Sequence, residues 1–113
     1  MTTQKYSRTL PSPFDVAVSY YSALSALNHL SLGEKEIQLI ALIATSPLRH
    51  KQVREQFIEQ FKSSRASVAN MVGKLKKKKI ITEDLKVNPY AHPDFSSPIQ
   101  LIVTLKVTNG EAV

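Results

Sequence analysis

The sequence predicts a mainly α-helical fold with a small β-segment, an α+β arrangement in the order α-α-α-α-β-β. Two observations support this prediction. Apolar residues recur every three or four positions through residues 13–79, as they do along one face of a helix. β-branched residues gather instead in residues 80–82 and 99–107, which is typical of strands.

A length of 113 residues gives room for one domain with one core. We place that domain at residues 13–108. Residues 1–12 are polar and lack periodicity, so we expect a flexible N-terminal arm. Residues 109–113 follow the last predicted strand, and we expect them to form a C-terminal tail.

The composition excludes several classes of protein. The chain has no cysteine, which rules out disulfides, Cys-ligated zinc and thiol catalysis. No apolar run approaches the roughly 18 residues of a membrane span. The polar start does not resemble a signal peptide, so we expect a cytoplasmic protein.

The first helix is predicted from Pro13, which suits a first helical turn, to about Leu30. Its apolar stripe is broad enough to face a second chain, although closing the chain's own core is the simpler interpretation. The residues of that predicted homodimer surface are Phe14, Tyr20, Tyr21 and Leu24.

Two further helices follow. Ser31 and Glu34 have the spacing of a capping box, in which the serine caps a helix and the glutamate reaches back to the serine N–H. The helix from Glu34 to about Ala44 is apolar on most sides and is therefore predicted to be the centre of the core. A third helix is predicted over residues 48–61.

The fourth helix is predicted over residues 64–79, with Ser63 or Ser64 as its cap. Val68, Met71, Val72 and Leu75 form its apolar stripe. The opposite face has only small or cationic residues: Ser63, Ala66, Asn70, Gly73, Lys74 and Lys77. A rod-like polyanion has close access to such a face, which favours a recognition helix. The alternative is an ordinary core helix with a solvated lysine end.

The positive charge is concentrated near this helix. The net charge of the whole chain is +6. Residues 1–60 carry six Lys/Arg against five Asp/Glu, whereas residues 61–113 carry nine against four, and Lys76 to Lys79 are consecutive. A local basic field indicates a polyanionic partner, most often nucleic acid. Lysines also suit the negative end of a helix dipole, so a solubilising helix end is the plainer explanation.

The order of elements predicts a helix-turn-helix followed by a wing. The third helix, a short turn and the capped fourth helix form the first part. The strand at 99–107 places Leu101, Val103, Leu105 and Val107 on one face. With residues 80–82 as its partner strand, it predicts a hairpin over 82–107 that acts as the wing.

Residues 24–107 resemble the winged helix-turn-helix superfamily. The resemblance lies in LNHLSLGEKEIQLIALIA, VREQF and SSRASVANMVGKLKKKKII, followed by the predicted hairpin. The first segment looks like the MarR-type regulators. The family typically has a glycine where this chain has Lys79. The wing sequence KVNPYAHPDFSSP looks more like small winged-helix proteins encoded by bacteriophages.

The resemblance implies positions for DNA contacts. Six residues would lie at or near the bases of the major groove: Ser63, Ser64, Arg65, Ser67, Asn70 and Lys74. Five lysines would contact phosphate: Lys51, Lys62, Lys77, Lys78 and Lys86. Arginine matches the acceptors of guanine and asparagine matches adenine, so we assign those bases to Arg65 and Asn70. For each residue the alternative is a solvated side chain.

Chemistry of other kinds is not indicated. His29, His50 and His92 are scattered, with no ligand at metal-binding spacing. Glu83 and Asp84 are adjacent, so on a strand their side chains would point to opposite faces. We expect no enzyme, no metal and no cofactor.

The sequence therefore predicts a protein that binds double-stranded DNA, a small transcriptional regulator of a bacterial or phage-infected cell. The alternative is a winged helix that binds another protein, as a component of a virion or a replication assembly. Binding to RNA has only the charge in its favour.

Overall fold

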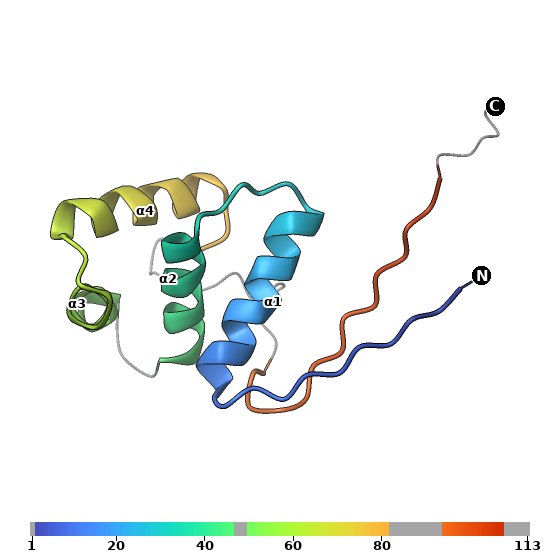
Figure 1. Cartoon of the computed structure of the whole chain (residues 1–113). Helices are drawn as coiled ribbons and strands as arrows, with labels where there is room; N and C mark the ends of the chain where they lie inside the picture. Colours follow the sequence, from blue (N-terminus) through green and yellow to red (C-terminus); the bar gives the residue numbers. More distant parts are fainter. Residues whose placement is uncertain (1, 47–49, 82–93, 108–113) are drawn as a thin grey trace.

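The computed structural model describes residues 2–46, 50–81 and 94–107, and within them the chain forms four helices and no strand (Figure 1). The helices are α1 (Pro13–Leu27), α2 (Glu34–Thr45), α3 (His50–Phe61) and α4 (Arg65–Lys77). All four predicted helices are confirmed, with ends that differ from the predicted ones by at most three residues. None of these helices is long and apolar enough to span a membrane.

The helices pack in chain order, α1 on α2, α2 on α3 and α3 on α4. α2 stands between α1 and the α3–α4 pair (Figure 1). It is the most buried of the helices, as its nearly continuous apolar run predicts: Ile37, Leu39, Ile40, Ala41, Leu42 and Ile43 are all buried. The predicted stripe of α4 also faces this core, through Val68, Val72 and Leu75, with Met71 partly buried beside it.

The start of α2 corrects the predicted capping box. Ser31 does not cap the helix, because its φ of 54° lies in the left-handed region, whereas an N-cap needs extended backbone. Gly33 is the N-cap instead, and Glu36, not Glu34, reaches back: its Oε1 accepts a hydrogen bond of 2.9 Å from the Gly33 N–H. The box is therefore shifted by two residues.

Three helices end in the same way. In each, a left-handed residue follows the last helical turn, and the N–H after it donates to the carbonyl five residues earlier, as in the Schellman arrangement. These N–H groups belong to Leu30, Ser63 and Ile80, and they donate to the carbonyls of Ser25, Ile58 and Leu75 at 3.0, 3.2 and 3.0 Å. The left-handed residues are His29, Lys62 and Lys79, with φ values of 53°, 53° and 59°. The helices thus end sharply without the usual glycine.

The predicted strand at 99–107 is not seen among the described residues. The segment is extended but has no hydrogen-bonded neighbour among the described residues, and it runs away from the helical body (Figure 1). Alternation of apolar residues indicates which side chains share a face, but a strand also needs a paired neighbour. Ile81 forms a lone β-bridge, and residues 82–93 of the predicted wing lie outside the described residues.

The start of this segment is anchored on α1. The ring of Phe95 is buried against Tyr20 and Tyr21, with ring centroids 5.4 and 5.6 Å away, and Ile99 packs on the same core. Burial raises the pKa of Tyr21, with a smaller contribution from the neighbouring Tyr20. Much of the broad stripe of α1 is therefore covered by the chain itself, and the homodimer predicted through this helix stays untested.

Candidate nucleic-acid interface

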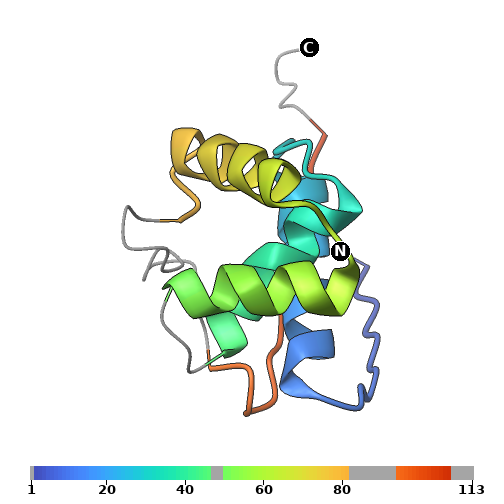
Figure 2. The same cartoon turned by 90° about the vertical axis from the view of Figure 1, so that its left-hand side faces the viewer.

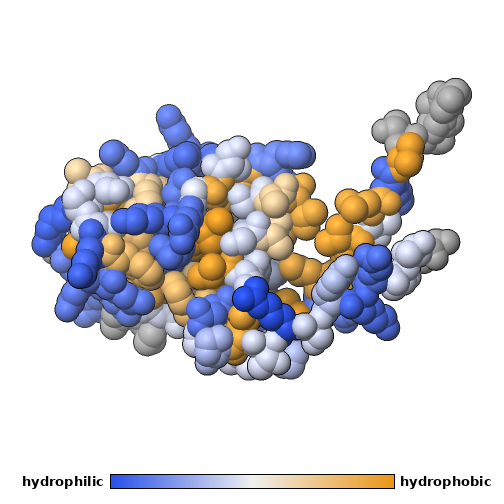
Figure 3. Space-filling model, in the orientation of Figure 1, coloured by the Kyte–Doolittle hydropathy of each residue, from blue (hydrophilic) through white to orange (hydrophobic). Residues whose placement is uncertain are grey.

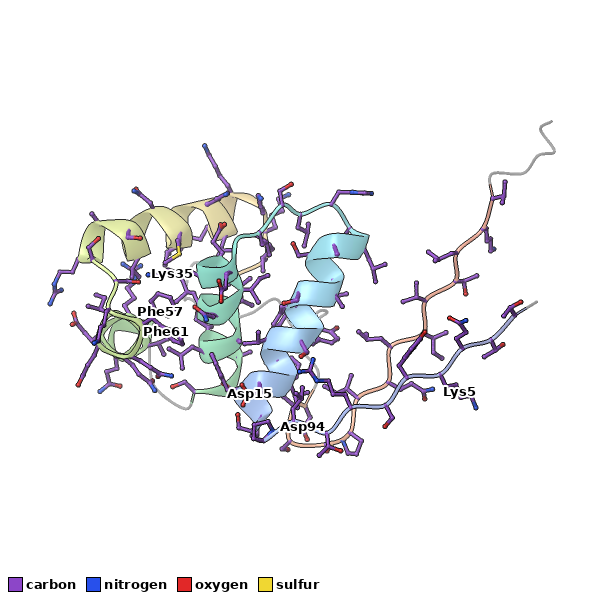
Figure 4. The ribbon with its side chains drawn as sticks, viewed as in Figure 1. Lys5, Asp15, Lys35, Phe57, Phe61 and Asp94 are labelled. Carbon is purple, nitrogen blue, oxygen red and sulfur yellow. The ribbon has the colours of Figure 1, made fainter. Side chains whose placement is uncertain are left out.

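A tight turn joins α3 to α4. Lys62, Ser63 and Ser64 separate the two helices, and the left-handed backbone at Lys62 reverses the chain directly after Phe61. Phe61 is held by a contact with the core, because its ring centroid lies 4.7 Å from that of the fully buried Phe57 (Figure 4). The helix, three-residue turn and second helix confirm the predicted arrangement of this region.

Both helices of this pair lie on the side of the body opposite to the segments 2–10 and 99–107 (Figure 1), and both face the viewer in Figure 2. Hydrophilic residues cover them, as the space-filling view shows (Figure 3). α4 is held by its buried stripe, so its opposite face is directed to solvent. Ala66, Asn70 and Gly73 are exposed on that face, and a Cβ added at Gly73 would meet no atom within 4 Å.

Ser64 caps α4, as predicted for one of the two serines. Its hydroxyl accepts a 3.0 Å hydrogen bond from the Ser67 N–H. Its neighbour Ser63 is partly buried, and its hydroxyl accepts a hydrogen bond of 3.3 Å from Lys35 Nζ at the start of α2 (Figure 4). The start of α4 therefore presents the positive end of its dipole and a lysine from another helix.

Arg65 lies in the first turn of α4 and is paired with Glu55 on α3. Its two terminal nitrogens meet the two carboxylate oxygens, Nη1 to Oε1 at 2.8 Å and Nη2 to Oε2 at 3.3 Å. Both side chains are exposed, by 79% and 48%. Such exposed pairs contribute about 0–1 kcal/mol to stability, so Arg65 is held in place but not committed to the fold.

Two of the cations at the end of α4, Lys74 and Lys78, contact other parts of the fold. Lys74 Nζ lies 3.3 Å from Oε1 of Glu36, whose side chain is only 10% exposed. Lys78 is partly buried, and its amine donates to the carbonyl of Leu30. Lys77, between them in sequence, is exposed and has no hydrogen bond or ion pair within the described part of the chain.

The structure thus brings together the six predicted base-contacting residues on one helix and its turn, but it does not leave them equally available. Asn70 is exposed and unpaired among the described residues, whereas Arg65 and Lys74 have carboxylate partners. Of the predicted phosphate contacts, Lys62 and Lys77 are exposed and Lys78 faces the body. The side chain of Lys51 and all of Lys86 lie outside the described residues.

Sequence reasoning missed the two carboxylates and Lys35. Glu36 had a signal, because it stands four and seven residues before Ile40 and Ile43 and so shares their buried face. Glu55 and Lys35 had none. Each meets its partner across a turn or between helices, 10 and 28 positions apart in sequence.

The described residues form no large enclosed pocket, and the candidate interface is an exposed surface. A cavity of about 150 Å³ lies between α3 and α4 beside Arg65, smaller than the roughly 300 Å³ at which ligand pockets begin. A hollow of about 380 Å³ near His29 is wide open to solvent. No group of three or more His, Cys, Asp or Glu with metal-binding geometry occurs in the described ranges.

Comparisons of this chain with protein-family models, with curated proteins and with solved structures found no match.

Proposed function

We propose that this chain binds double-stranded DNA by placing α4 in the major groove, and that it acts as a small transcriptional regulator. The observation that carries the proposal is the solvent face of α4, which directly follows a three-residue turn. Small exposed residues let a duplex approach the helix backbone, and an arginine, an asparagine and a lysine are spaced along it. A major groove about 12 Å wide admits such a helix.

Arg65 and Asn70 are the residues we propose to contact bases. Asn70 is free to pair with adenine. To contact guanine, Arg65 must first leave Glu55. Breaking an exposed ion pair costs about 0–1 kcal/mol. A bidentate contact to a base contributes about 1–3 kcal/mol of discrimination, so the exchange is favourable.

Phosphate contacts are assigned to the exposed cations around α4, which are Lys35, Lys62 and Lys77. Lys35 enters because its amine already lies at the turn beside Ser63. Lys74 and Lys78 contribute less, since their amines are held by Glu36 and by the Leu30 carbonyl.

The winged form of the fold belongs to the same proposal. The extended segment 99–107 has the length and the alternation of a wing strand, and it would become one on pairing with another strand.

Anisotropy of a labelled random duplex, titrated across salt concentrations, tests the proposal. We expect log K to fall steeply with log[salt], because each phosphate contact releases counterions. Lys77→Gln should reduce the slope by about 0.9. Lys78→Gln is the matched control, with the same change of charge one residue away, and should leave the slope nearly unchanged. No binding at low salt would refute the proposal.

A second function is favoured by one observation. Residues 101–107 expose an unusual amount of apolar surface for a segment outside the core (Figure 3). A protein-interaction module, in a virion or a replication assembly, would use such a surface. A stoichiometric complex with a foreign protein that survives salt high enough to screen surface charge, together with no affinity for DNA, would favour this function.

A further inference from the structure

The segment 99–107 is extended, apolar and unpaired. Ile102, Leu105 and Val107 are more than four-fifths exposed, and none of the nine residues forms a hydrogen bond within the described part of the chain. Its only charged residue is Lys106, and the only nearby proline, Pro98, precedes it. A long apolar segment with a single charge and no internal proline pairs readily with another strand, and natural proteins cover such edges.

The sequence of the segment indicates what covers it. In an antiparallel pair, residues directly opposite each other lie on the same face of the ribbon. When the segment pairs with a second copy of itself about Val103, the opposed residues are Ile99 with Val107, Leu101 with Leu105, and Val103 with Val103. Every apolar residue of that face then meets an apolar residue.

The other face of this ribbon is also compatible. Ile102 lies opposite Thr104, and Gln100 lies opposite Lys106, so no two like charges are opposed. The two Lys106 side chains stand six positions apart along the ribbon, roughly 20 Å at the rise of a strand. That separation exceeds the Debye length of about 8 Å at physiological salt.

We propose that residues 99–107 pair antiparallel with the same segment of a second copy of this chain, about a two-fold axis at Val103. The interface is isologous, as in most protein dimers. Its outer ends are supported by the two helical bodies, because each segment leaves its body at Ile99, which packs on the core beside the anchored Phe95. The pairing does not depend on DNA binding.

Disulfide cross-linking tests the pairing and its register. The chain has no cysteine, so one introduced cysteine is the only thiol. Val103→Cys places two thiols directly opposite each other, with Cβ atoms about 5 Å apart. Ile102→Cys is the matched control: its two copies sit diagonally, with Cβ atoms about 7 Å apart, beyond the range of a disulfide. We expect the covalent dimer to form several-fold more at position 103.

Sedimentation equilibrium gives an independent measurement. The full chain should form a dimer that dissociates on dilution, and Val103→Lys should make it monomeric by opposing two lysines at the axis. Ile102→Gln, which adds no charge to the other face of the ribbon, should leave the dimer intact. Both residues are outside the core, with Val103 50% and Ile102 84% exposed, so both variants should keep the circular dichroism of the parent.

Either of two results would overturn the proposal. A monomer at all concentrations, without cross-linking at position 103, would mean that the segment pairs within its own chain or with a foreign protein. Equal cross-linking at positions 102 and 103 would mean association without the proposed register.

Discussion

The two ends of α4 each carry a cation paired with a carboxylate, and the two pairs differ in burial. At the start, Arg65 and Glu55 are both well exposed. Towards the end, Lys74 is half exposed, but its partner Glu36 is buried and also caps α2 through the Gly33 N–H. If the first ion pair is broken, both charged groups stay in contact with water. If the second is broken, a contact between α2 and α4 is lost.

This difference separates the recognition that we propose from the stability of the fold along one helix. A cation in an exposed pair exchanges its partner at little cost. A buried carboxylate that loses its partners has an unsatisfied charge, and this costs several times more. One oxygen of Glu36, Oε2, already lies buried without a hydrogen-bond partner in the described structure. The exposed pair at the start of α4 can therefore exchange partners at little cost, whereas the pair towards its end helps to hold the fold.

The largest effect is expected at Glu36. Replacing it by alanine removes the cap of α2 and the partner of Lys74, so we expect a loss of about 1–2 kcal/mol in the free energy of unfolding. Urea denaturation followed by circular dichroism measures this loss. Glu36→Gln retains an oxygen for the Gly33 N–H and should lose less. A loss at Glu36→Ala no larger than that at Glu55→Ala would contradict the comparison.

A smaller effect, of opposite sign, is expected two residues past the end of the helix. Lys79 holds φ at 59°, a conformation that glycine adopts without strain. Lys79→Gly should therefore stabilise the fold by about 1 kcal/mol, despite the added freedom of the unfolded chain.

Lys77→Gly is the matched control for this change. The same substitution in the last turn of the helix should destabilise by about 1 kcal/mol, since glycine is a poor helix former. Thermal melts of the two variants should thus shift in opposite directions. A shift in the same direction would mean that the backbone at Lys79 does not limit stability.

Helix periodicity and capping patterns predicted the features of this structure that are set by residues close together in sequence. The stripe of Val68, Val72 and Leu75 fixed which face of α4 is buried, and the serine cap fixed where the helix begins. The face of the helix left for a ligand followed from these two facts alone.

Contacts between distant residues were not predictable in this way. The pairing of Glu55 with Arg65 depends on how tightly the turn folds, which is set by a left-handed lysine and not by a glycine that a pattern would reveal. The strand expected at 99–107 is not seen for a related reason, because its alternation describes one strand and says nothing about a neighbour. The site was therefore predicted as a set of side chains, and its electrostatics only appeared in the structure.

The smallest effect on stability is expected at Glu55. A change in DNA binding by a Glu55 variant can therefore be attributed to the start of α4 and not to a loss of folded protein. Glu55→Gln should change the free energy of unfolding by less than about 0.5 kcal/mol. It should also strengthen duplex binding about threefold, because Arg65 is released and a negative charge near the phosphates is removed. Anisotropy at fixed salt measures this gain.

Glu59→Gln separates the two causes of that gain. Glu59 is exposed one turn further along α3 and has no ion pair among the described residues, so its replacement removes the same charge without releasing an arginine. A gain limited to Glu55→Gln means that Arg65 is the group that DNA captures. An equal gain in both variants means that only net charge matters, and Arg65 then has no special place at the start of the helix.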